Sequence, residues 1–461
     1  MKRPNILFVF SDQHRYSALG CSGNGVVQTP SLDRLAAEGA AFDQAFSCYP
    51  LCSPYRAQLL TGTYCHKNLV VCNEYALKGG QQTLAHVLGA AGYRTGFIGK
   101  WHLGHGPYPE EKRHGFDYLA AYNCGHGFYK TSYHENDRGP IPFDCWAPEG
   151  ETSLAIRFMQ QHAADGAGRP FALLVGWAPP HWPYDEFPQE FNVYDPAKVD
   201  LPGNVPEQMR EFARKELALY YGCVAALDAQ MGRLLDALER LGLAEETIVC
   251  FSSDHGDHLS SHGYGKPGDS WLPAYMRASK ATAYEESIHV PLLMRWSGQM
   301  PAGRRSGALV GSVDIMPTLL GLCGLESPQG VQGMDLSHAA TGRQGPVPDS
   351  VYLQNMGVGW PPRREFTGFW RGVRTERWLY ARWLNDRLGP WLFDRHSDPE
   401  EMNNLAGRSE HAQTQQELEA LLRRWIDRTE DPFETGRREP PKNMLALGQE
   451  FASDRWKEPK A

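Results

Sequence analysis

The chain has 461 residues, of which 41% are hydrophobic, and it carries a formal net charge of −8. This length suffices for one large α/β domain with a smaller domain beside it. The negative charge argues against non-specific binding to nucleic acid, and no apolar run approaches the length of a membrane span.

The ten cysteines are scattered and form no paired Cys-x-x-Cys blocks of the kind that bind zinc. Several lie in apolar runs, which suits a reducing compartment. A buried strand is predicted to begin by about Asn5, which leaves no room for a signal peptide. We therefore expect a cytoplasmic protein, or a periplasmic one if an N-terminal leader has been removed.

The first predicted element is a strand over 5–10, a continuous apolar run typical of a central strand that is buried on both faces. Asp12 and Gln13 follow directly. Because open α/β sheets bind ligands beyond the carboxyl ends of their strands, Asp12 is a candidate functional residue. A helix over 29–39, with Pro30 in its first turn, comes next.

The segment after Cys52 predicts a two-turn helix. Ser53 is a suitable N-cap, Pro54 suits the first helical position, and Gly62 suits the position after the last turn. The N–H groups of a helix N-terminus favour an anion, so they would stabilise a Cys52 thiolate or a tetrahedral oxyanion. Arg56, one turn further on, adds a forked cation suited to sulfate or phosphate oxygens.

Polar residues also follow two further predicted strands, over 94–98 and 171–175. Lys100 and His102 come after the first strand, and His181 lies in a proline-rich turn after the second. Between them, residues 105–150 are rich in His, Tyr, Gly and Pro, and we expect a loop or lid that faces the substrate. A helix is predicted over 151–163.

A long amphipathic helix over 207–241 leads into a fourth strand over 247–251, which Asp254 and His255 follow. If the four strands lie in one parallel sheet, their polar groups meet in one crevice.

Two lysines follow further along the chain, Lys266 and Lys280, and Lys280 lies four residues before Tyr284. Residues 266–279 look like an insertion.

Another capped helix is predicted from Asp314. Beyond about 345, short strands are predicted over 371–374, 378–380 and 391–394, and a helix is predicted over 409–429 with Ser409 as its N-cap. The predicted domains are 1–345, 346–435 and a charged tail over 436–461 that is a surface strap or partly disordered.

Several stretches resemble the signatures of the type I sulfatases. Cys52–Arg56 resembles the segment in which the cysteine of that family is oxidised to formylglycine, and 92–102 resembles the second family signature. Residues 180–184 resemble another family segment, and 280–292 resemble the lysine-bearing segment of the family. The spacing to Tyr284 makes Lys280 the preferred lysine for the crevice, and Lys266 is its rival. The resemblance spans nearly the whole chain. It implies an alkaline-phosphatase-like α/β sandwich with a large, mostly parallel central sheet flanked by helices. It also implies a small C-terminal α+β subdomain with an antiparallel sheet, because 398–405 resembles the C-terminal subdomain of the family.

The resemblance also implies a divalent metal, with the ligands Asp12, Gln13, Asp254, His255 and the residue made from Cys52. Oxygen ligands suit Ca²⁺ or Mg²⁺. Gln13 stands where a second aspartate is frequent in the family, and His255 stands where asparagine is frequent. Because His255 offers only nitrogen, Mn²⁺ or Zn²⁺ are alternatives. Both departures also resemble phosphonate monoester hydrolases and choline sulfatases.

The implied reaction is the hydrolysis of a sulfate ester. Formylglycine hydrates and one of its oxygens attacks sulfur, while Lys100, Lys280, Arg56 and the metal offset the charge on the sulfuryl oxygens. His181 or Lys280 would protonate the leaving alcohol. His102 would take the proton of the second hydroxyl, so that sulfate is expelled.

The substrate stays open at this point. Aromatic and basic residues of the variable loops could stack on sugar rings, which favours a sulfated carbohydrate, or they could simply pack the loops. They are Tyr108, Phe128, Tyr129, Tyr133, Trp146, Trp271, Tyr275, Trp360, Arg363, Arg364 and Trp370. A phosphonate or phosphodiester hydrolase, a choline-sulfatase-like enzyme and a non-catalytic sulfoglycan-binding protein are the other hypotheses.

The implied partners are a sulfated small molecule or glycan and the maturation enzyme that makes formylglycine from Cys52. No partner nucleic acid or membrane is expected. The sequence does not indicate an oligomeric state.

Overall fold

The structure is a computed structural model that describes residues 3–73, 75–166, 168–264, 276–356, 368–384 and 389–433. Its strands are β1 (Asn5–Asp12), β2 (Ala40–Phe46), β3 (Arg94–Lys100), β4 (Tyr118–Tyr122), β5 (Ser132–Glu135), β6 (Arg138–Pro142), β7 (Phe171–Pro180), β8 (Thr247–Ser253), β9 (Leu292–Arg295), β10 (Arg304–Gly311), β11 (Val351–Met356), β12 (Phe369–Arg374), β13 (Trp378–Trp383) and β14 (Trp391–Asp394).

The α-helices are α1 (Pro30–Ala37), α2 (Cys52–Thr61), α3 (Cys65–Asn68), α4 (Leu84–Ala90), α5 (Ala147–Asp165), α6 (Arg210–Arg240), α7 (Glu285–Ile288), α8 (Ile315–Leu322), α9 (Ser337–Ala340) and α11 (Ala412–Thr429). Short 3-10 helices lie at Gly20–Ser22, Glu110–Lys112, Gln189–Phe191, Pro196–Lys198, Glu207–Met209, Ser312–Asp314 and Ser409–His411.

The strands form two sheets. Across the described residues, the large one has ten strands in the order β10-β2-β9-β8-β1-β7-β3-β4-β5-β6, and the small one has the order β11-β12-β13-β14. β8, β1, β7 and β3 are neighbours and all pair in parallel. This confirms the prediction that the four strands with polar residues at their carboxyl ends share one parallel sheet.

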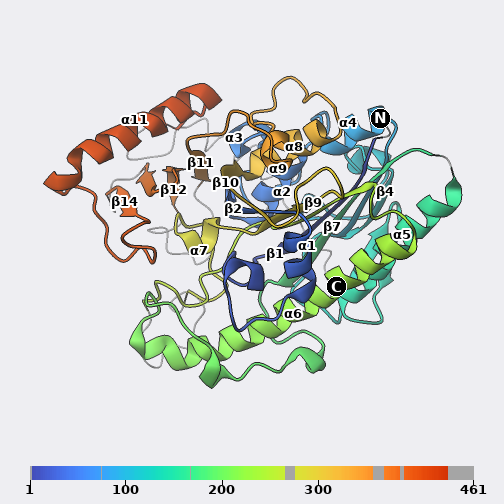
Figure 1. Ribbon diagram of the computed structural model, residues 1–461, viewed down its shortest axis with the longest axis horizontal. Coiled ribbons are helices and arrows are strands. Elements are labelled where there is room, and N and C mark those ends of the chain that lie inside the picture. The colour runs from blue at the N-terminus through green and yellow to red at the C-terminus, as the bar shows by residue number, and fades with distance from the viewer. Residues whose placement is uncertain are drawn as a thin grey trace.

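Helices cover both faces of the large sheet, as Figure 1 shows. Side chains of β1 alternate between the two faces. Leu7 and Val9 pack in one core with residues of α1, α5 and α6, while Ile6, Phe8 and Phe10 pack in the opposite core with residues of α2, α4 and α8. The central strand is therefore buried on both sides, and the predicted α/β sandwich is confirmed.

The stretch 105–150 is not the continuous loop that we expected. It contains β4, which pairs in parallel with β3, and the antiparallel strands β5 and β6, which extend the sheet edge. α5 also begins at Ala147, ahead of the predicted start at 151. These strands are short, so the pairing of β4 with β3, of β5 with β4 and of β6 with β5 decides their conformation, rather than local pattern.

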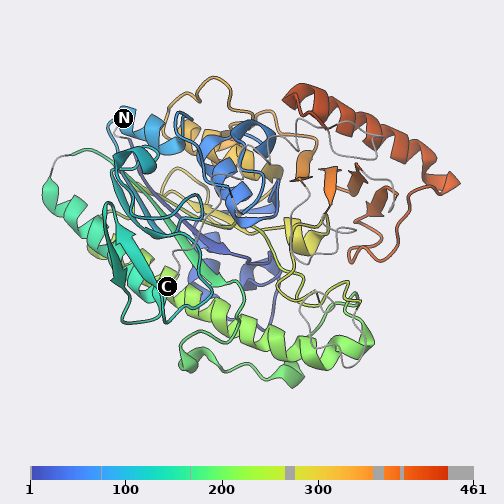
Figure 2. The ribbon, with the colours of Figure 1, turned by 180° about the vertical axis from the view of Figure 1, so that it is seen from behind.

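The small antiparallel sheet and α11 lie together at one end of the molecule in both views (Figure 1 and Figure 2). Trp370 and Leu422 share a core there with Phe46 and Ile288 of the larger part. The predicted strands correspond to β12, β13 and β14, whereas β11 was not predicted. Ser409 is not the N-cap of α11, because it opens a 3-10 turn and His411 precedes the helix. The predicted tail over 436–461 lies outside the described residues.

Candidate active site

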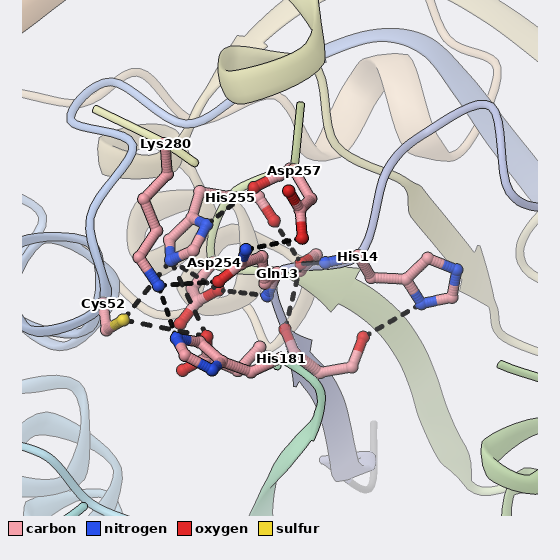
Figure 3. Close-up of polar contacts among 12 residues, drawn as sticks. Gln13, His14, Cys52, His181, Asp254, His255, Asp257 and Lys280 are labelled. Atoms are coloured by element: carbon pink, nitrogen blue, oxygen red, sulfur yellow. Dashed lines mark hydrogen bonds and ion pairs between the residues drawn. The ribbon is translucent and has the colours of Figure 1, made fainter. Parts of the chain in front are cut away.

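The predicted site residues lie at the carboxyl ends of the four parallel strands. Asp12 ends β1, Lys100 ends β3, His181 follows β7, and Asp254 follows β8. Figure 3 shows the side chains of His181, Asp254, His255 and Lys280 around Cys52, the first residue of α2. Residues far apart in the sequence thus meet in one crevice, as the strand pattern predicts.

The helix that carries Cys52 begins two residues earlier than predicted. Cys52 is its first residue and Leu51 precedes it, so the prediction of Ser53 as N-cap is wrong. The Ser53 hydroxyl instead donates to the carbonyl of His102 at 2.5 Å, which ties α2 to the segment after β3. Gly62 follows the helix in the left-handed conformation, with φ of 64°, as predicted.

A buried cluster of metal-ligand type surrounds Cys52. Donor atoms of Asp12, Cys52, Asp254 and His255 all lie within 4.8 Å of one another. Cys52 Sγ is 3.3 Å from Nε2 of His255 and 3.7 Å from Oδ1 of Asp12. His255 Nδ1 is 2.9 Å from the carbonyl oxygen of Gly256, which can only accept, so in the neutral ring Nε2 presents its lone pair to the cluster. This donor set fits a divalent cation.

Gln13 lies beside this cluster in the left-handed conformation, with φ of 69°. Its amide Nε2 donates to Asp257 at 2.6 Å, and its Oε1 accepts from Lys280 Nζ at 2.6 Å. Its backbone N–H donates to Asp254 at 2.9 Å. Because the side-chain oxygen already accepts from an ammonium group, the role of Gln13 as a metal ligand stays a prediction.

Two cations hold the carboxylates of the cluster. Lys100 Nζ lies 2.6 Å from Oδ2 of Asp12, and one nitrogen of Arg56 lies 3.1 Å from Asp12 and 3.2 Å from Asp254. The Arg56 guanidinium also donates to the carbonyl of Lys100 and packs over the Phe10 ring, 4.8 Å from its centroid. Arg56 therefore positions the two carboxylates from within the core.

Burial and charge act in opposite directions on the acids of the site. Burial alone would raise the pKa of Asp12, but Lys100 and the neighbouring cations hold it well below its usual range. Burial and the negative charge of Asp12 raise the pKa of Asp254 to about 7. Although burial and Asp12 act to raise the pKa of Cys52, Lys280, Lys100 and His255 lower it overall.

His181 and Lys280 form a proton-sharing pair. His181 Nδ1 lies 2.7 Å from the carbonyl of Trp182 and must donate to it, so Nε2 accepts from Lys280 Nζ at 2.5 Å. Burial and the Lys280 charge hold the pKa of His181 well below its usual range. The shared proton therefore resides on Lys280. The rival Lys266 lies outside the described residues.

Three residues near this pair were not predicted. Asp257, in the same loop as Asp254, accepts from Gln13 and from the Tyr184 hydroxyl. The His126 ring lies 4.8 Å from the His181 ring, and Cys124 is a neighbour of Lys100 and Cys52. The Asp-His-Gly-Asp spacing after β8 was the one signal that could have indicated Asp257. His14 points away from the cluster, as Figure 3 shows.

The loop aromatics pack into the protein rather than lining an open surface. Tyr108, Phe128, Trp146 and Trp370 are at most 2% exposed, and Tyr133 is 8% exposed. For these residues the packing alternative holds, and they are no argument for a sugar substrate. Tyr129, 44% exposed, is the exception among the described ones. The others, Trp271, Tyr275, Trp360, Arg363 and Arg364, lie outside the described residues.

Two global features accompany the site. No disulfide joins any of the ten cysteines. In the described parts of the chain, no helix combines the length and the apolar character that a bilayer span needs.

Comparisons with known proteins agree with this site. The sequence model of the sulfatase family matches residues 4–325, and that of the C-terminal region of N-sulphoglucosamine sulphohydrolase matches 277–428. An ulvan-active sulfatase of Formosa agariphila is 34% identical over 94% of this chain and 83% of its own length. An N-acetylglucosamine-6-O-sulfatase of Bacteroides thetaiotaomicron is 27% identical over 91% of this chain and 86% of its own.

Solved structures extend the comparison. One of them is a protein that was solved in complex with its substrate, D-glucosamine-2-N,6-O-disulfate. It has a TM-score of 0.82 and 26% identity to this chain, over 94% of this chain and 99% of that one. A phosphonate monoester hydrolase of Agrobacterium radiobacter has a TM-score of 0.73 over 92% of this chain and 96% of that one. At 22% identity, this second likeness indicates a shared fold alone.

Proposed function

The chain belongs to the sulfatase family, with an alkaline-phosphatase-like fold and the activity of a sulfuric ester hydrolase, and from this premise we propose that it removes sulfate from a sulfated sugar. One observation carries the assignment of the site: a cluster of metal-type donor atoms and the two lysines Lys100 and Lys280 lie together around Cys52. The sugar substrate is supported by the names of the relatives, which act on ulvan and on sulfated amino sugars.

We propose that Asp12, Asp254, His255 and the formylglycine made from Cys52 hold a divalent ion. Ca²⁺ is the first choice because three of these four donors offer oxygen, and Mg²⁺ or Mn²⁺ are the alternatives. A maturation enzyme that converts Cys52 is then a required partner. When bound, the ion supplies positive charge at the sulfuryl oxygens, and the aldehyde supplies the attacking hydroxyl.

The remaining chemistry belongs to the chain's own side chains. Lys280 Nζ holds the proton that it shares with His181, so Lys280 is the group that donates to the leaving oxygen. Lys100 and Arg56 balance the negative charge that the sulfate brings into a buried site.

His102 is the base of this proposal. Burial and the charge of Lys100 hold the pKa of its ring well below the usual range, so the ring is neutral near pH 7 and able to accept a proton. Its backbone is fixed on both sides, because its N–H donates to Asn123 and its carbonyl accepts from Ser53. The hydrogen bond from Ser53 therefore holds the segment around His102 against α2.

The test compares wild type with Cys52→Ala. The substrates are N-acetylglucosamine 6-sulfate, N-acetylgalactosamine 6-sulfate, ulvan oligosaccharides, 4-nitrophenyl sulfate and a phosphonate monoester. We expect Cys52→Ala to lower kcat/KM roughly a thousandfold or more without loss of fold, because the nucleophile is removed. Mass spectrometry of the peptide 49–56 from wild type should show the aldehyde.

Cys223→Ala is the matched control, since Cys223 is a fully buried cysteine of α6 outside the crevice. It should keep its activity. Turnover by Cys52→Ala at the wild-type rate would contradict the nucleophile assignment, and faster turnover of the phosphonate than of any sulfate would contradict the substrate class.

A further inference from the structure

A cavity of about 620 Å³ lies at the carboxyl end of β4, next to the candidate active site. Its apolar wall includes Trp101 and Tyr108, and its polar wall includes His105, Asn123, Cys124 and His134. A volume of this size holds a small organic ligand such as a sugar ring.

The cavity and the catalytic crevice share a wall. Trp101 lies between Lys100 and His102 in the chain, and Asn123 accepts the backbone N–H of His102 at 2.9 Å through its carbonyl. Desolvation raises the pKa of the Cys124 thiol and the Lys100 ammonium opposes this shift, so the two groups are close. Cys124 lines the cavity and is also an electrostatic neighbour of Cys52, so the cavity lies beside the crevice.

The polar wall has hydrogen-bonding capacity that the described residues do not fill. Asn123 is 9% exposed, and its Nδ2 donates to His105 Nε2 at 3.2 Å, which fixes the amide. Its Oδ1 is buried and has no partner among the described residues, and the same holds for Nδ1 of His134. An unfilled buried acceptor is costly, so a ligand that donates a hydrogen bond would bind there.

We propose that this cavity is the subsite for the sugar ring of the sulfate ester, with Asn123 Oδ1 accepting a hydrogen bond from a ring hydroxyl. The inference rests on the proposed function and adds the place where the enzyme recognises the sugar ring. His105 holds the amide of Asn123 in the orientation that receives the hydroxyl. An aryl sulfate has no ring hydroxyl and gains nothing from Asn123.

The test is a ratio of specificity constants. kcat/KM is measured for 4-nitrophenyl sulfate and for the sulfated sugar of the panel above that wild type hydrolyses fastest. In Asn123→Ala, the ratio of the sugar value to the aryl value should fall about tenfold, mainly through KM, which corresponds to one lost hydrogen bond. His105→Ala should lower the ratio in the same direction. Asn192→Ala is the control, because Asn192 is an exposed asparagine that directly follows the 3-10 helix Gln189–Phe191. It should leave the ratio at the wild-type value.

Each other outcome has a definite meaning. An unchanged ratio, or equal losses on both substrates, overturns the subsite and leaves the proposed function intact. If Asn123→Ala fails to fold, the ratio measured for His105→Ala decides. Turnover of the aryl sulfate but of no sugar by wild type would overturn the proposed substrate class itself, and this result appears before any variant is made.

Discussion

At the scale of single residues, the negative charge of Asp12 and Asp254 explains why a further cation would stabilise the crevice. Both carboxyl groups are buried, and one Arg56 nitrogen contacts both. Because Asp12 and burial raise the pKa of Asp254 to about 7, the resident cations do not fully compensate two negative charges. A divalent ion beside both groups would let both ionise.

Asp254→Ala should therefore remove the bound metal. The variant loses one carboxylate of the four-residue donor cluster, and we expect metal per chain, measured by elemental mass spectrometry of the purified protein, to fall at least tenfold. Asp236→Ala changes an exposed aspartate of α6 and is the control, with occupancy equal to wild type. Unchanged metal content in Asp254→Ala would refute the ligand assignment.

The pair of Lys280 and His181 yields a second prediction at this scale. If Lys280 is the acid, its removal lowers kcat most for substrates with poor leaving groups, because these need a proton to leave. A nitrophenolate leaves without one. Lys280→Ala should lower kcat for a sulfated sugar about a hundredfold more than for 4-nitrophenyl sulfate. His181→Ala should show a smaller difference between the two substrates. A larger difference for His181→Ala would assign the acid to His181 instead.

At the scale of elements, β3 and β7 leave no room for a side chain just before Lys100. Gly99 pairs with Gly176 across the two strands and has a φ of 99°. A Cβ at Gly99 would lie only 2.3 Å from the carbonyl oxygen of Gly176. Glycine at this position therefore allows the strand pairing that brings Lys100 to Asp12.

Gly99→Ala should destabilise the fold by about 3 kcal/mol, through both the backbone conformation and the clash. It should also lower activity, because Lys100 is displaced. The free energy of unfolding is measured by urea denaturation. Gly89→Ala is the matched control: a Cβ there meets nothing within 4 Å, so the helix α4 should gain roughly 0.5–1 kcal/mol. Equal stabilities for the two variants would show that the close approach has no energetic consequence.

At the scale of the whole molecule, one buried carboxylate joins the C-terminal elements to the rest. Asp431, just after α11, accepts from Arg371 of β12 at 2.8 and 3.1 Å and from the Tyr352 hydroxyl of β11 at 2.9 Å. His66 of α3, from the larger part of the chain, lies 3.1 Å away. The carboxylate is thus the centre of a network between the small sheet, α11 and the large sheet's helices.

Asp431→Asn should lower the free energy of unfolding by about 3–5 kcal/mol at pH 7, since it leaves Arg371 as an unpaired buried charge. Burial acts to raise the pKa of Asp431, but Arg371 lowers it far below the ordinary value of 3.8. A lowered folded-state pKa means that the stabilisation is fully present above pH 3.8 and is lost as the pH falls through the folded-state value.

The measurement is urea unfolding of wild type and Asp431→Asn between pH 7 and pH 2.5. The difference in unfolding free energy should be constant above about pH 5 and should shrink below it. Asp427→Asn, an exposed position of α11, should change stability by less than about 0.5 kcal/mol. A difference that grows on acidification would contradict the ion-pair account.

Much of this architecture can be predicted from the amino-acid sequence. The apolar runs of β1, β3, β7 and β8 and the polar residues after them were predicted, because buried parallel strands need continuous apolar side chains and ligands bind at their carboxyl ends. Gly62 and the Cys52–Arg56 segment carry their own local signals. These features depend on near neighbours in the sequence, so a single sequence determines them.

Tertiary structure decided the rest. The start of α2 at Cys52, the strands β4 to β6, the burial of Tyr108 and Trp146, and the contact of Gln13 with Asp257 all depend on partners distant in the chain. Propensity describes what a segment can do alone, whereas strand pairing, burial and buried hydrogen bonds are settled by what packs against it. The sequence by itself therefore indicated which groups are candidates for the chemistry, and only the fold decided which of them touch.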